Sequence, residues 1–207
     1  DSFYVEEESF YQIWEVKLNK NSKQNVLESI KILEKRDDIM MAFPNYYTKC
    51  CSTNSENTTT DETAKLNVSA TRTPNDSDVS QQWAIDKIGL TEAWNITTGS
   101  TSVNVGIIDT GIMGNHPDLI NSVNRSLSKD FTGGNSPLTD PDGHGTHIAG
   151  IIGAQGNNST GISGVCWNVS LVSLKAATYS SDEKSYVVSY SRFAEAIDYA
   201  QAQEIPI

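Results

Sequence analysis

The chain has 207 residues and a formal net charge of −11, and 37% of its residues are hydrophobic. This length can hold one domain of ordinary size or two small ones, and the hydrophobic content is sufficient for a globular core. The negative charge argues against nucleic acid and anionic membranes as partners. No apolar run reaches the roughly 18 residues that a membrane-spanning helix requires. The three cysteines, Cys50, Cys51 and Cys166, show no metal-binding spacing.

Residues 1–47 predict a small α+β domain. Hydrophobic residues at alternate positions within 14–18 predict a half-buried strand. A second strand is expected at 39–43, where Pro44 ends it. Between the two strands, Ser22 can cap a helix whose apolar face would be formed by Val26, Leu27, Ile30 and Leu33.

The rest of the chain divides by composition. Residues 48–72 are rich in Ser, Thr and Asn, which predicts a flexible linker. From residue 73 onward, strands alternate with helices. This alternation predicts an α/β fold for 73–207, with a parallel sheet and crossover helices. The expected elements are a helix at 88–94, a strand at 103–108, a helix at 144–154, a strand at 169–175 and a helix at 190–203, with 205–207 beginning another strand.

Asp109 stands at the end of the apolar strand in V-N-V-G-I-I-D-T-G-I, residues 103–112. Polar residues at the carboxyl ends of parallel strands face the crevice in which open α/β sheets bind ligands. A plain turn aspartate followed by a turn glycine would give the same D-T-G sequence. Aspartic proteases also contain D-T-G, but they pair two such motifs in an all-β fold, whereas this chain has an α/β pattern. Asp109 is therefore a candidate site residue.

His144 lies in a second segment, D-G-H-G-T-H-I-A-G at 142–150. Glycine is a poor helix former, so the small residues after His144 indicate a helix that packs closely in a crowded centre. Such a helix would present the imidazole from its first turn. An aspartate bound to one ring nitrogen leaves the other nitrogen able to accept a proton from a serine. Asp109 and His144 are therefore predicted to be the orienting acid and the base of one catalytic site.

The residues around His144 allow more than one interpretation. His147 forms an H-x-x-H pair with it that could bind a metal, but no third ligand cluster is visible, and a structural role is preferred. His116, in N-H-P-D-L, is interpreted as a packed or surface histidine. Asp142 could favour the positive end of the helix, or it could line a subsite for basic substrate residues. The D-x-D-G fragment that starts at Asp140 resembles an EF-hand loop, which is rejected because the required later glutamate is absent.

Together these segments resemble the subtilisin-like serine proteases, and within them the thermitase-like members. The order of Asp109 and His144 matches the order Asp, His, Ser of the subtilisin triad. M-M-A-F-P-N-Y at 40–46 resembles the end of the inhibitory propeptide that precedes such catalytic domains. The resemblance implies a secreted, monomeric endopeptidase zymogen that acts on peptides. Residues 1–47 would be its intramolecular propeptide, and the maturation cleavage would fall within 48–72.

The run G-N-N-S-T-G-I-S-G at 156–164 follows the histidine motif. By composition it is a polar surface loop, although its carbonyl groups could turn inward around a hard cation. The thermitase-like proteases have a similar N-N-S-T-G-I run at this distance after H-G-T-H, and the resemblance therefore implies a structural Ca²⁺ site. The implied ligands are carbonyl groups of Gln155, Thr160 and Ile162, a side-chain oxygen of Asn158, and carboxylates of Asp76 and Asp118.

The serine nucleophile that the resemblance requires is not found among the 207 residues. No serine stands in a G-T-S-M/A or G-x-S-x-G context. We expect the chain to be the propeptide and the first half of such a protease, without measurable peptidase activity as given. The alternative is a short non-catalytic inhibitor that uses residues 1–47 to occupy the cleft of a complete protease. Substrate preference, the maturation bond and the redox state of the cysteines stay open.

Overall fold

The computed structural model describes residues 16, 18, 22–36, 38, 39, 42, 47–49 and 72–207, with the backbone alone at 47–49. The chain divides into two compact units, Asp1–Tyr46 and Tyr47–Ile207. The strands predicted at 14–18 and 39–43 lie, apart from isolated positions, outside the described residues. The same holds for the greater part of the segment predicted as a linker.

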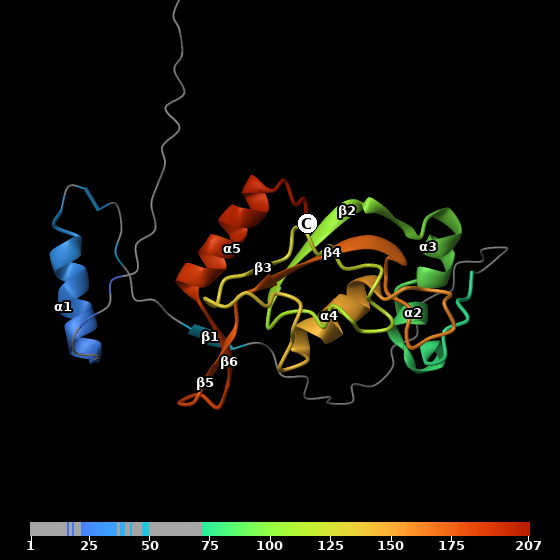
Figure 1. Ribbon diagram of the computed structural model, residues 1–207, viewed down its shortest axis with the longest axis horizontal. Helices are drawn as coiled ribbons and strands as arrows, with labels where there is room; N and C mark the ends of the chain where they lie inside the picture. Colours follow the sequence, from blue (N-terminus) through green and yellow to red (C-terminus); the bar gives the residue numbers. More distant parts are fainter. Residues whose placement is uncertain are drawn as a thin grey trace, which may run out of the picture. The chain divides into compact units, whose positions relative to one another are not determined.

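The helix predicted after Ser22 is confirmed as α1, Lys23–Leu33 (Figure 1). Ser22 has extended backbone angles, and its hydroxyl accepts a hydrogen bond from the backbone N–H of Asn25 at 3.2 Å. This bond satisfies one of the N–H groups that the first helical turn leaves without a partner. No residue of α1 is buried, so its apolar stripe is at most partly covered.

The second unit is built on a parallel sheet of three strands in the order β2-β4-β3 (Figure 1). β2 is Gly99–Asp109, β4 is Asn168–Lys175 and β3 is Lys129–Asp130. Both outer strands pair with β4 in the parallel direction. The strands predicted at 103–108 and 169–175 are therefore confirmed, and so is the α/β fold class.

Two helices cover opposite faces of this sheet. α4 is His144–Gly153 and α5 is Tyr190–Ala202, close to the predicted ranges. On β4, Leu171 packs in the same hydrophobic cluster as residues of α4, while its neighbour Val172 packs in the cluster that includes α5. Successive side chains of a strand point to opposite faces. β4 is therefore buried on both faces, which is the pattern of an internal strand in a parallel sheet.

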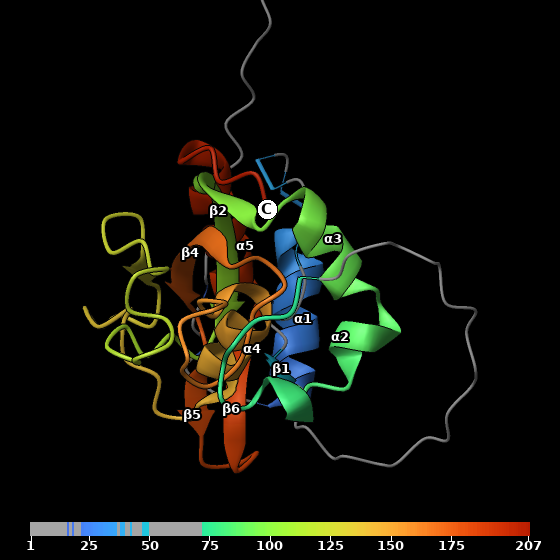
Figure 2. The same cartoon turned by 90° about the vertical axis from the view of Figure 1, so that its right-hand side faces the viewer.

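A second, antiparallel sheet is not among the predicted elements. Its order is β1-β6-β5, with β1 at Tyr47–Lys49, β5 at Thr178–Ser180 and β6 at Ser185–Ser189. β5 and β6 form a hairpin inserted between β4 and α5, and both views show them side by side (Figures 1 and 2). Lys184, in the turn between them, has a left-handed φ of 49°. β1 pairs with β6 and covers the start of the segment predicted as a linker.

The helix predicted at 88–94 is wrong in its extent, because two short helices occupy this region. α2 is Ala84–Lys87 and α3 is Leu90–Ile96, and Gly89 between them has a left-handed φ of 68°. A left-handed residue cannot continue a right-handed helix, so the chain changes direction here. The pair buries Trp94, and α3 leads into β2 (Figure 2).

The remaining segments of the second unit carry little regular structure. A short 3₁₀ helix, η1, spans Val79–Gln81. Residues 205–207 form no strand, contrary to the prediction, although the N–H of Gly106 donates to the carbonyl oxygen of Ile207 at 2.7 Å. Within the described ranges, no helix has the length and apolar character needed to cross a membrane.

α4 lies so close to β4 that Gly153 has no room for a side chain. A Cβ there would be 2.4 Å from Cγ1 of Val169. We predict that Gly153→Ala lowers the free energy of unfolding by about 1–3 kcal/mol through overpacking. Gly150→Ala is the matched control, since its nearest neighbour would be 3.4 Å away, and it should be neutral or stabilising by up to about 1 kcal/mol. Urea denaturation compares the two variants, and an equal loss of stability in both would contradict the prediction.

Candidate active site

Asp109 is the last residue of β2, and its partner in the parallel register is Lys175, the last residue of β4. The strand thus delivers the carboxylate to the carboxyl edge of the sheet, where open α/β sheets bind ligands. Asp109 is 8% exposed, and its Oδ1 accepts the backbone N–H of Thr110 at 2.7 Å. The carboxylate is therefore largely shielded from water and held by its own turn.

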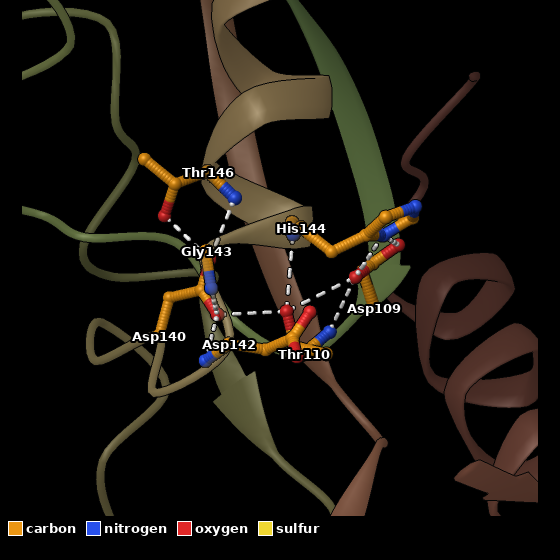
Figure 3. A network of polar contacts seen from close by, with 8 residues as sticks. Asp109, Thr110, Asp140, Asp142, Gly143, His144 and Thr146 are labelled. Carbon is orange, nitrogen blue, oxygen red and sulfur yellow. Dashed lines mark hydrogen bonds and ion pairs between the residues drawn. The ribbon is translucent and has the colours of Figure 1, made fainter. Parts of the chain in front are cut away.

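His144 is the first residue of α4, and its imidazole reaches the Asp109 carboxylate (Figure 3). Nδ1 lies 2.8 Å from Oδ1 and 2.9 Å from Oδ2. Because an ionised carboxylate can only accept hydrogen bonds, this contact assigns the proton of the neutral imidazole to Nδ1. Nε2 then carries a lone pair that can take up a proton. The structure brings together the two residues that the sequence predicted as acid and base.

Two glycines allow the end of β2 to meet the start of α4. A Cβ on Gly145 would lie 2.1 Å from the carbonyl oxygen of Gly111 and 3.2 Å from Cβ of Asp109. Gly111 has a φ of 118°, which favours glycine, and a Cβ there would lie 2.2 Å from the carbonyl oxygen of Thr139. A larger residue at position 145 would push α4 away from the end of β2, and one at position 111 would displace Thr139 in the loop before α4. The sequence predicted that the small residues of this helix allow close packing, and at Gly145 the close neighbours are Gly111 and Asp109.

Asp140 connects the end of β2 to the start of α4, and sequence reasoning did not identify it as a site residue. It is 9% exposed. Its carboxylate accepts hydrogen bonds from both elements (Figure 3). The donors are the hydroxyl of Thr110 at 2.7 Å, the N–H groups of Asp142 at 3.2 Å and Gly143 at 2.9 Å, and the N–H and hydroxyl of Thr146 at 2.8 Å and 2.6 Å.

The pKa of Asp140 lies below its ordinary value of 3.8. Burial by itself would raise this pKa, but hydrogen bonds from the side chains of Thr146 and Thr110 favour the charged form and outweigh burial. The positive end of the α4 dipole also favours a negative charge at this position. Asp140 is therefore ionised at neutral pH, the state in which both of its oxygens can only accept.

The carboxylate that accepts N–H groups at the start of α4 is Asp140, from Gly143 and Thr146, whereas sequence reasoning considered Asp142 for the charge at this helix end. The side chain of Asp142 is exposed, and its backbone N–H is itself a donor to Asp140. The signal was present in T-D-P-D-G, which offers two carboxylates before the helix. The sequence could not distinguish them, because the path of the turn decides which carboxylate faces inward.

The other two histidines line a separate cavity. His147 is exposed, and Nδ1 of His116 accepts the N–H of Asp118 at 3.3 Å. Both lie in the wall of an open cavity of about 350 Å³ beside α4. In the part of the chain that the structure describes, no three His, Cys, Asp or Glu side chains are placed to hold a metal ion. The structural role preferred for His147 stays a prediction.

The loop predicted to bind calcium is held by Asp76 and Asp118. Asp76 accepts the N–H groups of Asn157 and Asn158, each at 2.8 Å. Asp118 accepts the side-chain N–H of Asn158 at 2.9 Å and the N–H of Ile162 at 3.0 Å. Both carboxylates are buried, and neither forms an ion pair with a lysine or arginine among the described residues. Two buried carboxylates without a cationic partner among the described residues thus lie beside one loop.

The remaining predicted ligands, Gln155, Asn158 and Thr160, lie in this loop or directly before it. The side-chain oxygen of Asn158 accepts the N–H of Thr160 at 2.8 Å, and the N–H of Gln155 donates to the carbonyl oxygen of Asp118 at 3.0 Å. Carboxylate, amide and carbonyl oxygens are the ligands that Ca²⁺ prefers. Because buried charges without a counter-charge are costly, the residues present fit a bound divalent cation.

Comparison with known proteins shows to which family the chain is similar. The model of the subtilase family, Peptidase S8, matches residues 100–207. The chain is 36% identical to thermitase from Thermoactinomyces vulgaris over an alignment of 135 positions, which covers 58% of this chain and 47% of thermitase. It is 42% identical to subtilisin DY from Bacillus licheniformis over 99 residues, 48% of this chain and 32% of that protein. The solved structure of sphericase is 37% identical to this chain with a TM-score of 0.44, and the match covers 61% of this chain and 42% of the sphericase chain.

The chain spans less than half the length of these two curated relatives. The family match covers more than half of the chain itself, and both Asp109 and His144 lie within the matched residues. The chain therefore belongs to the subtilase family.

Proposed function

We propose that this chain carries the proton-transfer half of a subtilisin-like serine endopeptidase. The observation that carries the proposal is the contact of 2.8 Å between Nδ1 of His144 and Oδ1 of Asp109. The contact lies at the carboxyl edge of the parallel sheet, within the residues that match the subtilase family. In an Asp-His-Ser triad such a carboxylate orients the imidazole and stabilises the imidazolium that forms.

In the proposed reaction, Nε2 of His144 takes the proton of a serine hydroxyl while the serine oxygen attacks a peptide carbonyl carbon. The imidazolium then gives this proton to the leaving amine, and water repeats the cycle to release the acyl group. Asp109 stays ionised and keeps the proton on Nδ1. Because no serine here stands in a G-T-S context, we assign the nucleophile to a part of the protein outside these 207 residues. The chain as given would then lack peptidase activity.

β1 lies where the proposed propeptide, 1–47, meets the proposed linker, 48–72, and it supports binding of this junction to the edge of β6. Its residues Tyr47–Lys49 pair antiparallel with β6, Thr48 opposite Val188. Addition of an extended strand to a sheet edge is a general way to bind a peptide, because main-chain hydrogen bonds give affinity for any sequence. We infer that residues 1–47 act as an intramolecular propeptide, that cleavage falls within 48–72, and that residues 73–207 belong to the catalytic domain. Peptide substrates would use the same edge of β6.

A non-catalytic inhibitor that acts through residues 1–47 is not favoured, because the family match falls on 100–207. Two relatives support a secreted enzyme by their names. One is a halolysin-like extracellular serine protease from Natrialba magadii, 33% identical over 109 residues, and the other is an extracellular protease from Xanthomonas campestris, 31% identical over 136 residues. We therefore propose secretion for the complete protein. Its monomeric state stays a prediction.

The triad assignment is tested in the complete protein of which this chain is proposed to be a part. We predict that His144→Ala lowers kcat by about 10⁶-fold and that Asp109→Asn lowers it by about 10⁴-fold, because the imidazole then adopts the wrong tautomer. Hydrolysis of a chromogenic peptide measures both. His147→Ala is the matched control, one turn further along α4, and should retain activity. A His144→Ala variant as active as the wild type would refute the assignment.

We further propose a structural Ca²⁺ site at the loop that follows α4. Its ligands would be side-chain oxygens of Asp76, Asp118 and Asn158 together with backbone oxygens of Gln155, Thr160 and Ile162. Support comes from the two buried carboxylates without a cationic partner among the described residues. A bound ion would neutralise these charges and link the loop to two distant parts of the chain. Its effect would be on stability, since proton transfer is assigned to Asp109 and His144.

Calcium binding predicts a stability that depends on chelators. A ligand that binds the folded state at 100 times its Kd adds about 2.7 kcal/mol to the free energy of unfolding. EDTA should therefore lower the Tm of the wild-type chain, and Asp118→Asn should remove this response. Asp182→Asn, an exposed carboxylate in the turn between β5 and β6, should keep it. Thermal unfolding followed by circular dichroism checks the prediction, which fails if Asp118→Asn responds to EDTA as the wild type does.

A further inference from the structure

We propose that Asp140 is a positioning residue that accepts the hydroxyl proton of Thr110 and thereby keeps this proton away from Asp109. The inference rests on the proposed roles of Asp109 and His144 and adds a third carboxylate to the site. Asp140 takes no part in proton transfer. It acts on the base through the direction of one buried hydroxyl group.

The hydroxyl of Thr110 lies between two carboxylates (Figure 3). Its oxygen is 2.7 Å from Oδ1 of Asp140 and 3.1 Å from Oδ1 of Asp109. A hydroxyl group has one proton, so it donates to one carboxylate at a time. The shorter distance indicates that the Thr110 hydroxyl donates its hydrogen bond to Asp140 and keeps its proton. Thr110 is 0% exposed, so bulk water does not compete for it.

This direction determines how strongly Asp109 binds the imidazole. Oδ1 of Asp109 already accepts the N–H of Thr110 at 2.7 Å and lies 2.8 Å from Nδ1 of His144. A hydroxyl donor added to the same oxygen would stabilise the carboxylate charge further and weaken its attraction for the imidazole N–H. Asp140 prevents this, because it accepts the competing proton.

The same arrangement attaches α4 to the end of β2. The oxygen of Thr110 accepts the N–H of Gly145 at 3.0 Å, using a lone pair that is available while its proton points to Asp140. Thr146 repeats the pattern, since its hydroxyl donates to Oδ2 of Asp140 at 2.6 Å and accepts the N–H of Met113 at 2.9 Å. Asp140 therefore fixes the orientation of two hydroxyl groups, each of which joins the helix to the strand or to the turn after it.

Asparagine at this position would have nearly the same shape but a different donor and acceptor pattern. Oδ1 of Asp140 accepts from Thr110, Asp142 and Gly143, and Oδ2 accepts twice from Thr146. An amide offers one oxygen, and its NH₂ group would face donors on the other side. The lowered pKa of Asp140 reflects the same surplus of donors. The remaining amide oxygen carries no charge and is a weaker acceptor than the carboxylate of Asp109, so in Asp140→Asn the Thr110 hydroxyl is expected to turn toward Asp109.

The test observes the proton between His144 and Asp109 by ¹H NMR in the 207-residue chain. A hydrogen-bonded imidazole Nδ1–H gives a resonance downfield of the amide region, and we expect it in the wild type. Asp140→Asn should shift it upfield or abolish it. In a Thr110→Val background, which has no hydroxyl to turn, Asp140→Asn should cause no such change. Asp142→Asn, an exposed carboxylate in the same turn, is the matched control and should leave the resonance in place.

A measurement on the wild type makes the test independent of whether the variants fold. The Thr110 hydroxyl proton should show a nuclear Overhauser effect to the amide proton of Gly143, which shares Oδ1 of Asp140. An Overhauser effect to the His144 Nδ1 proton in its place would overturn the proposal. So would a folded Asp140→Asn variant whose resonance is unchanged.

These outcomes separate this inference from the proposed function. If the resonance responds as described but the complete protein hydrolyses no peptide, the proposed function fails and the positioning role of Asp140 stands. If the complete protein is an active protease and Asp140→Asn leaves both the resonance and kcat unchanged, the positioning role fails and the proposed function stands.

Discussion

The structure depends on one hydrogen bond, between a carboxylate at the end of β2 and an imidazole at the start of α4. Asp109 and His144 are 35 residues apart in the chain, yet Nδ1 lies 2.8 Å from Oδ1. Parallel pairing with β4, which is buried on both faces, fixes the strand. The absence of a side chain on Gly145 lets the helix approach it. Because an error of about 1 Å in such a contact can cost a catalytic site two orders of magnitude in rate, these packing features are requirements of the proposed chemistry.

Buried carboxylates are the second recurring feature of this acidic chain. Asp109 and Asp140 bind N–H and hydroxyl donors around the first turn of α4, and Asp76 and Asp118 bind N–H donors of the loop that follows its last turn. Each pair accepts hydrogen bonds from both backbone and side-chain donors, which offsets part of the cost of burying charge. α4 therefore runs from the proposed catalytic pair to the proposed calcium site, and it lies within the residues that match the subtilase family.

Much of the site could be predicted from the sequence, because Asp109 and His144 lie in local motifs whose spacing and order identify them. The parallel sheet followed from the alternation of strands and helices. Asp140 could not be predicted, since D-P-D-G offers two carboxylates and only the path of the turn selects one. The hairpin of β5 and β6 was missed because its turn uses Lys184 in a left-handed conformation, where the usual signal is Asn or Gly. The predicted helix at 88–94 is divided at Gly89, whose left-handed backbone angle is not revealed by the apolar pattern of the segment.

The central claim is that Asp109 holds the proton of His144 on Nδ1 and leaves Nε2 able to act as a base. The most direct measurement is a two-bond ¹H–¹⁵N spectrum of the histidine rings in the chain near neutral pH, which shows which ring nitrogen carries the proton. The account predicts the Nδ1–H form for His144, in contrast to the exposed His147, which contacts no carboxylate among the described residues. An Nε2–H form for His144, or a mixture of forms like that of a free imidazole, would contradict it.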